Sequence, residues 1–191
     1  SLFYGCKSIT RLNLPQNVSS IGSLAFSNCT SLKTITIPFQ VASIGESAFN
    51  GCKNLDDLVI PDAVKSIEES TFYGCSNLKT IKLSQNIIYI GPNAFRGCKS
   101  IKEIELPSHV LDLGRSTFAD CEKLVTFSMP NEIKIIPDEM FYRCSSLRNI
   151  VLPSSLEKIG ISAFYACDSL QLIKIPYATI QIGNQAFSGC I

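Results

Sequence analysis

Several residue types are scarce in this chain of 191 residues, which has no tryptophan, a single histidine and only 17% charged residues. A net charge of +1, with acids and bases interspersed, gives no basic patch of the kind that binds nucleic acid. No stretch approaches ~18 consecutive apolar residues, so we predict no direct membrane insertion by this segment.

Catalytic and cofactor motifs are also missing. The sequence has no CxxC pair, no glycine-rich phosphate loop, and no serine or cysteine with a base at a fixed local spacing. His109 falls in a variable position after a predicted strand, where an isolated histidine is usually a surface residue. We therefore expect no enzyme, no catalytic residue, no cofactor and no metal.

What the sequence does contain is a strict 23-residue repeat. Phenylalanine recurs at this step from Phe3 to Phe187, and cysteine recurs three residues later from Cys6 to Cys190. Proline keeps the same step from Pro15 to Pro176, except that Ser84 replaces it once. A fixed period of this length without insertions is typical of a solenoid. We predict one array over residues 1–191, with about eight coils, and interpret it as a fragment that lacks capping coils.

Positions that never carry a charge mark the inside of each coil. In one coil they are Leu32, Ile35 and Ile37, and the spacing of two between the last pair indicates a strand. A proline then ends the strand, because it has no N–H for the ladder. Val41 and Ile44 begin a second limb, which we predict to be a short strand followed by a tight helical turn.

A column of glycines runs from Gly22 to Gly183, but Glu68 and Pro137 occupy two of its positions. Proline cannot adopt a positive φ. We therefore expect these glycines to permit close packing of neighbouring coils rather than a left-handed turn.

The segment CTSLKTITIPFQVASIGESAF, residues 29–49, resembles the BspA-type leucine-rich repeat family, and the match extends along the whole chain. The resemblance implies a β-rich leucine-rich repeat solenoid with one parallel strand per coil on a concave face. The chain departs from common leucine-rich repeats at one position, where those repeats carry a ladder of asparagine or cysteine side chains. Here that position varies, from Asn17 through His109 to Ala178, and the buried cysteine comes before the strand.

The regular cysteines predict a stacked ladder of free thiols. Coils separated by ~4.8 Å place the cysteines above one another with parallel side chains, which is poor geometry for disulfides. A redox or metal role and disulfides are the alternatives. The predicted structural ladder comprises Phe26, Phe49, Phe72, Phe95, Phe118, Phe141 and Phe164 with Cys29, Cys52, Cys75, Cys98, Cys121, Cys144 and Cys167.

Charged residues gather on the outward positions of the predicted strands. The register places Lys79 beside Asp56 and Lys82 beside Glu105, with Glu103 nearby, so cross-strand ion pairs account for the pattern. A polar recognition patch is the second interpretation, and acid–base catalysis is the third.

Apolar residues also occupy outward positions of the second limb, namely Ile88, Tyr89, Leu111 and Ile135. Neighbouring residues of this kind could form a binding patch of a few hundred Å², or they could pack locally over the edge of the coils.

The family that the chain resembles is found mainly in surface-exposed and secreted proteins. The resemblance therefore implies a non-enzymatic protein-interaction module at the cell surface, an adhesion or ligand-binding segment whose protein partner belongs to the host matrix or a cell surface. The alternative is an intracellular scaffold or spacer, cytoplasmic or cytoskeletal. Reduced thiols suit the cytosol slightly better than an extracellular location.

Overall fold

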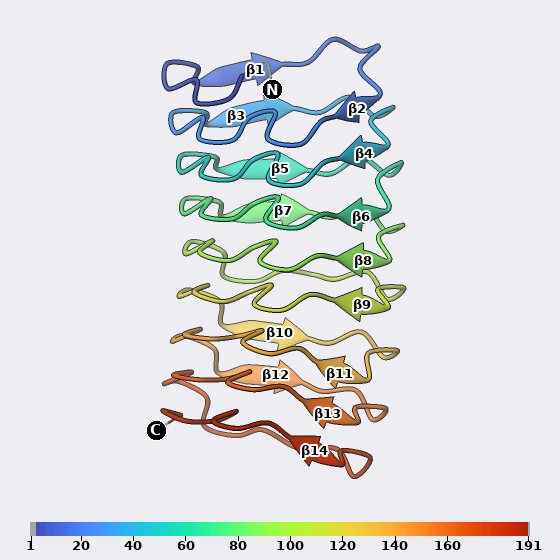
Figure 1. Cartoon of the computed structure of the whole chain (residues 1–191), viewed down its shortest axis with the longest axis vertical. Helices are drawn as coiled ribbons and strands as arrows, with labels where there is room; N and C mark the ends of the chain where they lie inside the picture. Colours follow the sequence, from blue (N-terminus) through green and yellow to red (C-terminus); the bar gives the residue numbers. More distant parts are fainter. Residues whose placement is uncertain (1–2, 191) are drawn as a thin grey trace.

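A computed structural model describes residues 3–190 of the chain; residues 1–2 and 191, the ends of the predicted array, lie outside the described residues. Figure 1 shows the coils stacked along the long axis from the N-terminus to the C-terminus. We number the coils 1 to 8 by the cysteine that ends each, from Cys29 to Cys190. The predicted parallel-strand solenoid is confirmed.

The first limb of each coil carries a three-residue strand in six coils. From β3 onward its central residue is buried and the last one is exposed, as in β5 with Leu58 and Val59, because one face packs on the core. Pairing is parallel with a register of 23 residues, so that Arg11 lies opposite Thr34. These strands are β1 (Arg11–Asn13), β3 (Thr34–Thr36), β5 (Asp57–Val59), β7 (Thr80–Lys82), β10 (Thr126–Ser128) and β12 (Asn149–Val151).

The second limb carries a two-residue strand in every coil. These strands form three separate parallel sheets, β2-β4, β6-β8-β9 and β11-β13-β14. They are β2 (Ser20–Ile21), β4 (Ser43–Ile44), β6 (Ser66–Ile67), β8 (Tyr89–Ile90), β9 (Asp112–Leu113), β11 (Ile135–Ile136), β13 (Lys158–Ile159) and β14 (Gln181–Ile182).

The segment between the second limb and the cysteine is not the predicted helical turn, and the described residues contain no helix. In coil 1, Leu24 and Asn28 have φ values of 59° and 58°, which interrupt a right-handed helix. Alternate N–H groups bond within the coil and to the next one: Ala25 donates to the Gly22 carbonyl, and Phe26 donates to that of Ala48. We call this segment, residues 22–29 and their equivalents, the turn edge.

Phenylalanine rings stack through the centre of the array. Successive rings are 5.2–6.0 Å apart between centroids, and those from Phe49 to Phe164 are fully buried. Aliphatic residues such as Leu55 and Ile67 fill the space around the stack. The regular spacing of the coils thus follows from an identical apolar set in each repeat.

The glycine column packs closely, as expected from the sequence. A Cβ at Gly91 would lie 2.7 Å from the Glu69 nitrogen, and one at Gly114 would lie 2.2 Å from the Pro92 nitrogen. No glycine from Gly22 to Gly183 in this column has a positive φ. Glycine therefore lets the second limbs approach one another.

Candidate interaction surface

An open groove crosses the strand face of coils 4 to 7. Its volume is about 900 Å³. Four of the charged residues singled out from the sequence, Lys79, Lys82, Glu103 and Glu105, line it together. We call this depression the strand-face groove; its other lining residues are Thr80, Ile81, Leu83, Gln85, Ser100, Lys102, Ile104, Thr126, Phe127, Ser128, Asn149 and Val151.

One of the two expected ion pairs forms. The Lys79 Nζ lies 2.8 Å from the Asp56 Oδ1, and this contact raises the pKa of Lys79, first through the hydrogen bond and then through the charge of Asp56. The expected pair of Lys82 with Glu105 is wrong, because no ion pair joins them in the described part of the chain. Residues 103–105 form no strand against β7, so the two columns are not held opposite each other.

The groove therefore contains charges without a protein counter-ion. Within residues 3–190, Lys82, Lys102, Glu103 and Glu105 make no ion pair. All four are exposed. Lys82 of coil 4 and Lys102, Glu103 and Glu105 of coil 5 bring both signs of charge into the groove, which favours a ligand that also carries both signs.

Peptide groups are open in the same place. Within the described chain, residues 103–105 make no backbone hydrogen bond, and the Lys102 carbonyl accepts one from the Val125 N–H at 2.9 Å. The peptide groups of residues 103–105 thus lie between coils 4 and 6 without the backbone partners that the paired strands have.

The apolar residues of the second limb do not form one continuous patch. Leu111 lies beside Ile88, since its N–H donates to the Ile88 carbonyl at 3.0 Å, and the two side chains are 63% and 47% exposed. Tyr89 is half-buried and pairs in register with Asp112, which separates it from Ile135. Burial, and then the nearby carboxylates led by Asp112, raise the pKa of Tyr89.

The nine cysteines are free thiols and have a bonding role that the sequence does not reveal. Each S–H from coil 1 onward donates to the phenylalanine carbonyl of the preceding coil, as from Cys52 to Phe26 at 3.1 Å and from Cys98 to Phe72 at 3.2 Å. Burial raises the pKa of Cys52 to about 12. No cluster of three or more potential metal ligands occurs in residues 3–190. The ladder thus ties coils together as well as filling space.

The repeat, the register and the stacked core agree with a family comparison. The profile of the BspA type leucine-rich repeat region matches residues 1–124 and 76–191, with six copies. The chain belongs to the BspA-type leucine-rich repeat family. Repeat solenoids of this family are typically non-enzymatic interaction scaffolds that bind proteins.

Solved structures of bacterial proteins share the fold. A leucine-rich repeat protein of T. pallidum, TpLRR, is 29% identical over 84% of this chain and 78% of its own, with a TM-score of 0.81. A leucine-rich cell surface protein of Faecalibacterium prausnitzii is 26% identical over 96% of this chain and 65% of its own, with a TM-score of 0.59. No curated protein matches the chain. The described residues include no helix that is long and apolar enough to cross a membrane.

Proposed function

We propose that this array is a non-enzymatic protein-interaction module of a cell-surface or secreted protein, and that it serves adhesion or ligand binding. The observation that carries the proposal is the strand-face groove, where unpaired charges and open peptide groups occur together in coils 4 to 7. The similarity to the F. prausnitzii leucine-rich cell surface protein supports the location. The partner would be a protein of a host matrix or a cell surface.

The groove suits an extended segment of a partner protein that carries both acidic and basic side chains. Acidic side chains of such a segment would meet Lys82 and Lys102, and basic ones would meet Glu103 and Glu105. Val151, which is 64% exposed, offers an apolar contact at one end.

An intracellular scaffold is the second candidate, and the nine free thiols favour it. Free thiols persist in reducing compartments. Burial protects the central ones, however, and raises the pKa of Cys75 and Cys98 well above its usual value, so that little reactive thiolate forms. The ladder is therefore compatible with an oxidising compartment as well.

The second-limb residues Ile88, Tyr89, Leu111 and Ile135 remain a second docking candidate. Apolar anchors often dominate protein interfaces. Here Asp112 divides the group and Tyr89 is half-buried, which leaves Ile88 and Leu111 as the adjacent exposed pair.

The test is binding of the purified array to immobilised extracellular-matrix proteins, measured for the parent and for three variants. Reversing the groove charges with Lys82→Glu plus Glu105→Lys should weaken binding at least about tenfold. Added salt should also weaken binding by the parent protein, because it screens the same charges. Lys65→Glu, a charge reversal on the second limb, is the matched control and should leave binding unchanged. Loss of binding in Leu111→Ser alone would instead assign recognition to the second limb.

A further inference from the structure

The sheet of the second limb is interrupted twice. Strand pairing is absent between β4 and β6 and between β9 and β11 in the described chain. Where pairing exists, flanking bonds extend it, as from the Ile88 N–H to the Lys65 carbonyl at 3.0 Å. The equivalent bonds of the Lys65 and Lys134 N–H groups to the preceding coil are also missing within residues 3–190. Coils 2 and 3, and coils 5 and 6, are thus unjoined along this limb.

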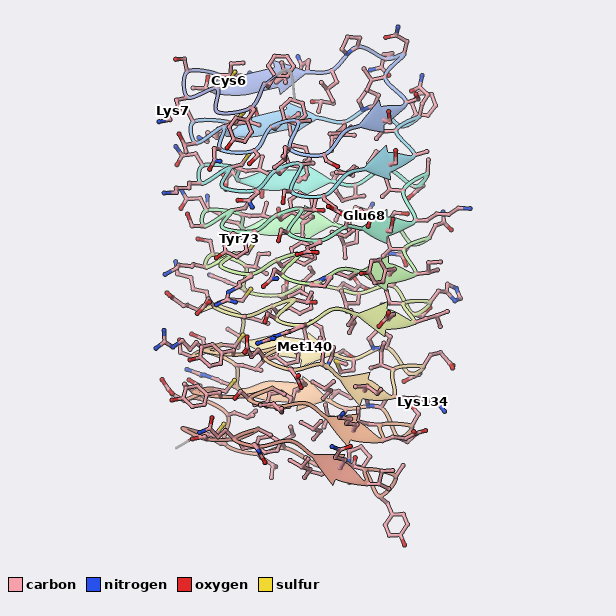
Figure 2. The ribbon with its side chains drawn as sticks, in the orientation of Figure 1. Cys6, Lys7, Glu68, Tyr73, Lys134 and Met140 are labelled. Carbon is pink, nitrogen blue, oxygen red and sulfur yellow. The ribbon has the colours of Figure 1, made fainter. Side chains whose placement is uncertain are left out.

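The glycine column accounts for both interruptions. Five of its glycines donate their N–H to the carbonyl 24 residues earlier at 2.7–2.8 Å; they are Gly45, Gly91, Gly114, Gly160 and Gly183. Glu68 and Pro137 occupy the same position immediately after β6 and β11, and Figure 2 labels Glu68 near β6. Proline has no N–H to donate. The two exceptions in the column coincide with the two gaps in the sheet.

Steric contact at Glu68 and Pro137 also keeps the neighbouring coils apart, in addition to the lost hydrogen bonds. A Cβ built at the five donating glycines would lie only 2.2–2.7 Å from an atom of the preceding coil. Any residue with a Cβ must therefore hold the two coils further apart. Glu68 and Pro137 both carry one.

The turn edge is continuous across the same junctions. Between coils 5 and 6, Ser116 donates its N–H to the Asp138 carbonyl at 3.0 Å, and Asp120 donates to that of Tyr142 at 2.7 Å. Phe118 adds a third bond, to the carbonyl of Met140 at 3.0 Å. The turn edge is hydrogen-bonded at several points across this junction, whereas the strands of both limbs are unpaired and the first limb keeps one bond, from the Val125 N–H to the Lys102 carbonyl. This is the arrangement of a hinge.

The junction at Pro137 is also the widest in the core. Phe118 and Phe141 are 6.0 Å apart, whereas every other successive pair of the stack lies within 5.2–5.5 Å. The ring of Phe127 lies edge-on to both, at 5.0 and 4.9 Å. Strand pairing on the first limb is absent here too, since residues 103–105 do not pair with β10.

We propose that the array bends at two joints, Glu68 and Pro137, with the turn edge as the hinge line and with coils 1–2, 3–5 and 6–8 as rigid blocks. This inference does not depend on the proposed function. It has a consequence for the strand-face groove, which is lined from coil 4 to coil 7 and therefore crosses the Pro137 joint. Bending there changes the width of the groove.

Residue-resolved amide hydrogen exchange on the native protein tests the Pro137 joint. In the parent, the Lys134 amide should exchange at least about tenfold faster than the Glu157 amide, its bonded equivalent one coil later. Pro137→Gly restores both the N–H and the close approach. The Lys134 amide should therefore slow by about tenfold or more, and the amide that the substitution introduces should itself be protected.

Pro130→Gly is the matched control, because it removes a proline from the same coil at a position outside this ladder. It should leave the Lys134 amide unchanged, which separates the joint from the general effect of losing a proline. Glu68→Gly should slow the Lys65 amide in the same way. Equal protection of Lys134 and Glu157 in the parent, or no slowing of Lys134 in Pro137→Gly, would overturn the proposal.

Discussion

At the scale of single residues, each coil holds two positions with left-handed backbone. One column is occupied by residues such as Leu24, Ser47 and Glu139, with φ between 53° and 59° and no glycine. The other is often glycine, as at Gly74 and Gly97, but Ala166 has a φ of 53° there. Left-handed backbone costs a residue with a Cβ about 1–2 kcal/mol. The inter-coil hydrogen bonds of the turn edge offset this cost, since residues of both columns donate to the next coil.

Ala166→Gly should therefore stabilise the array. Removing one methyl group relieves the left-handed strain, and we expect the free energy of unfolding to rise by about 0.5–1 kcal/mol in urea denaturation. Ala163→Gly is the control in the same coil: Ala163 is fully buried and is not among the left-handed residues. The free energy of unfolding of Ala163→Gly should fall by about 1 kcal/mol. Destabilisation of similar size by both changes would show that Ala166 is not strained.

At the scale of elements, the turn edge carries the polar links that join coil 5 to coil 6. Glu139 accepts hydrogen bonds from Arg115 and from the Ser116 hydroxyl, the latter at 2.9 Å. Burial alone would raise the pKa of Glu139, but these hydrogen bonds and the charge of Arg115 outweigh it and lower the pKa below its ordinary value of 4.5. The carboxylate thus stabilises the hinge line in its charged form.

A lowered pKa contributes stability above the unfolded value, and that contribution disappears as the pH falls through the folded value. Glu139→Gln should therefore be less stable than the parent at pH 7, and the difference should shrink as the pH falls below 4.5. Thermal unfolding of both proteins across this range is the measurement. A difference that stays constant with pH would mean that the charge of Glu139 does not contribute.

Periodicity in the sequence predicts the strands, the buried columns and the family, because each inward position repeats without a charge in all coils. It does not reveal the turn edge, although Gly51, Gly74, Asn28 and Asp120 at one position are a signal for left-handed backbone. Nor does it predict the failure of the Lys82–Glu105 pair, since coil 5 has the same pattern as its neighbours but forms no first-limb strand. Glu68 and Pro137 are visible as exceptions, yet their effect depends on a hydrogen bond to another coil.

At the scale of the whole molecule, the array combines a continuous edge with strand limbs that open at intervals. The turn edge, the phenylalanine stack and the thiol ladder run through all coils, whereas the sheets are short and separate. The strand-face groove lies where pairing is lost, and it gathers charges of both signs. Regular repeats thus build the scaffold, and the proposed recognition surface lies around coil 5, the coil of the groove that forms no first-limb strand.

Hydrogen exchange of the array, free and in complex with a matrix protein that it binds, tests this account most directly. Because residues 103–105 make no backbone hydrogen bond in the described structure, their amides should exchange rapidly in the free protein. We predict that binding slows the amides of residues 102–106 by about tenfold or more, together with those of the neighbouring groove strands. Unchanged exchange at residues 102–106, with protection confined to residues 88–90, 111–113 and 134–136, would contradict the account and place recognition on the second limb.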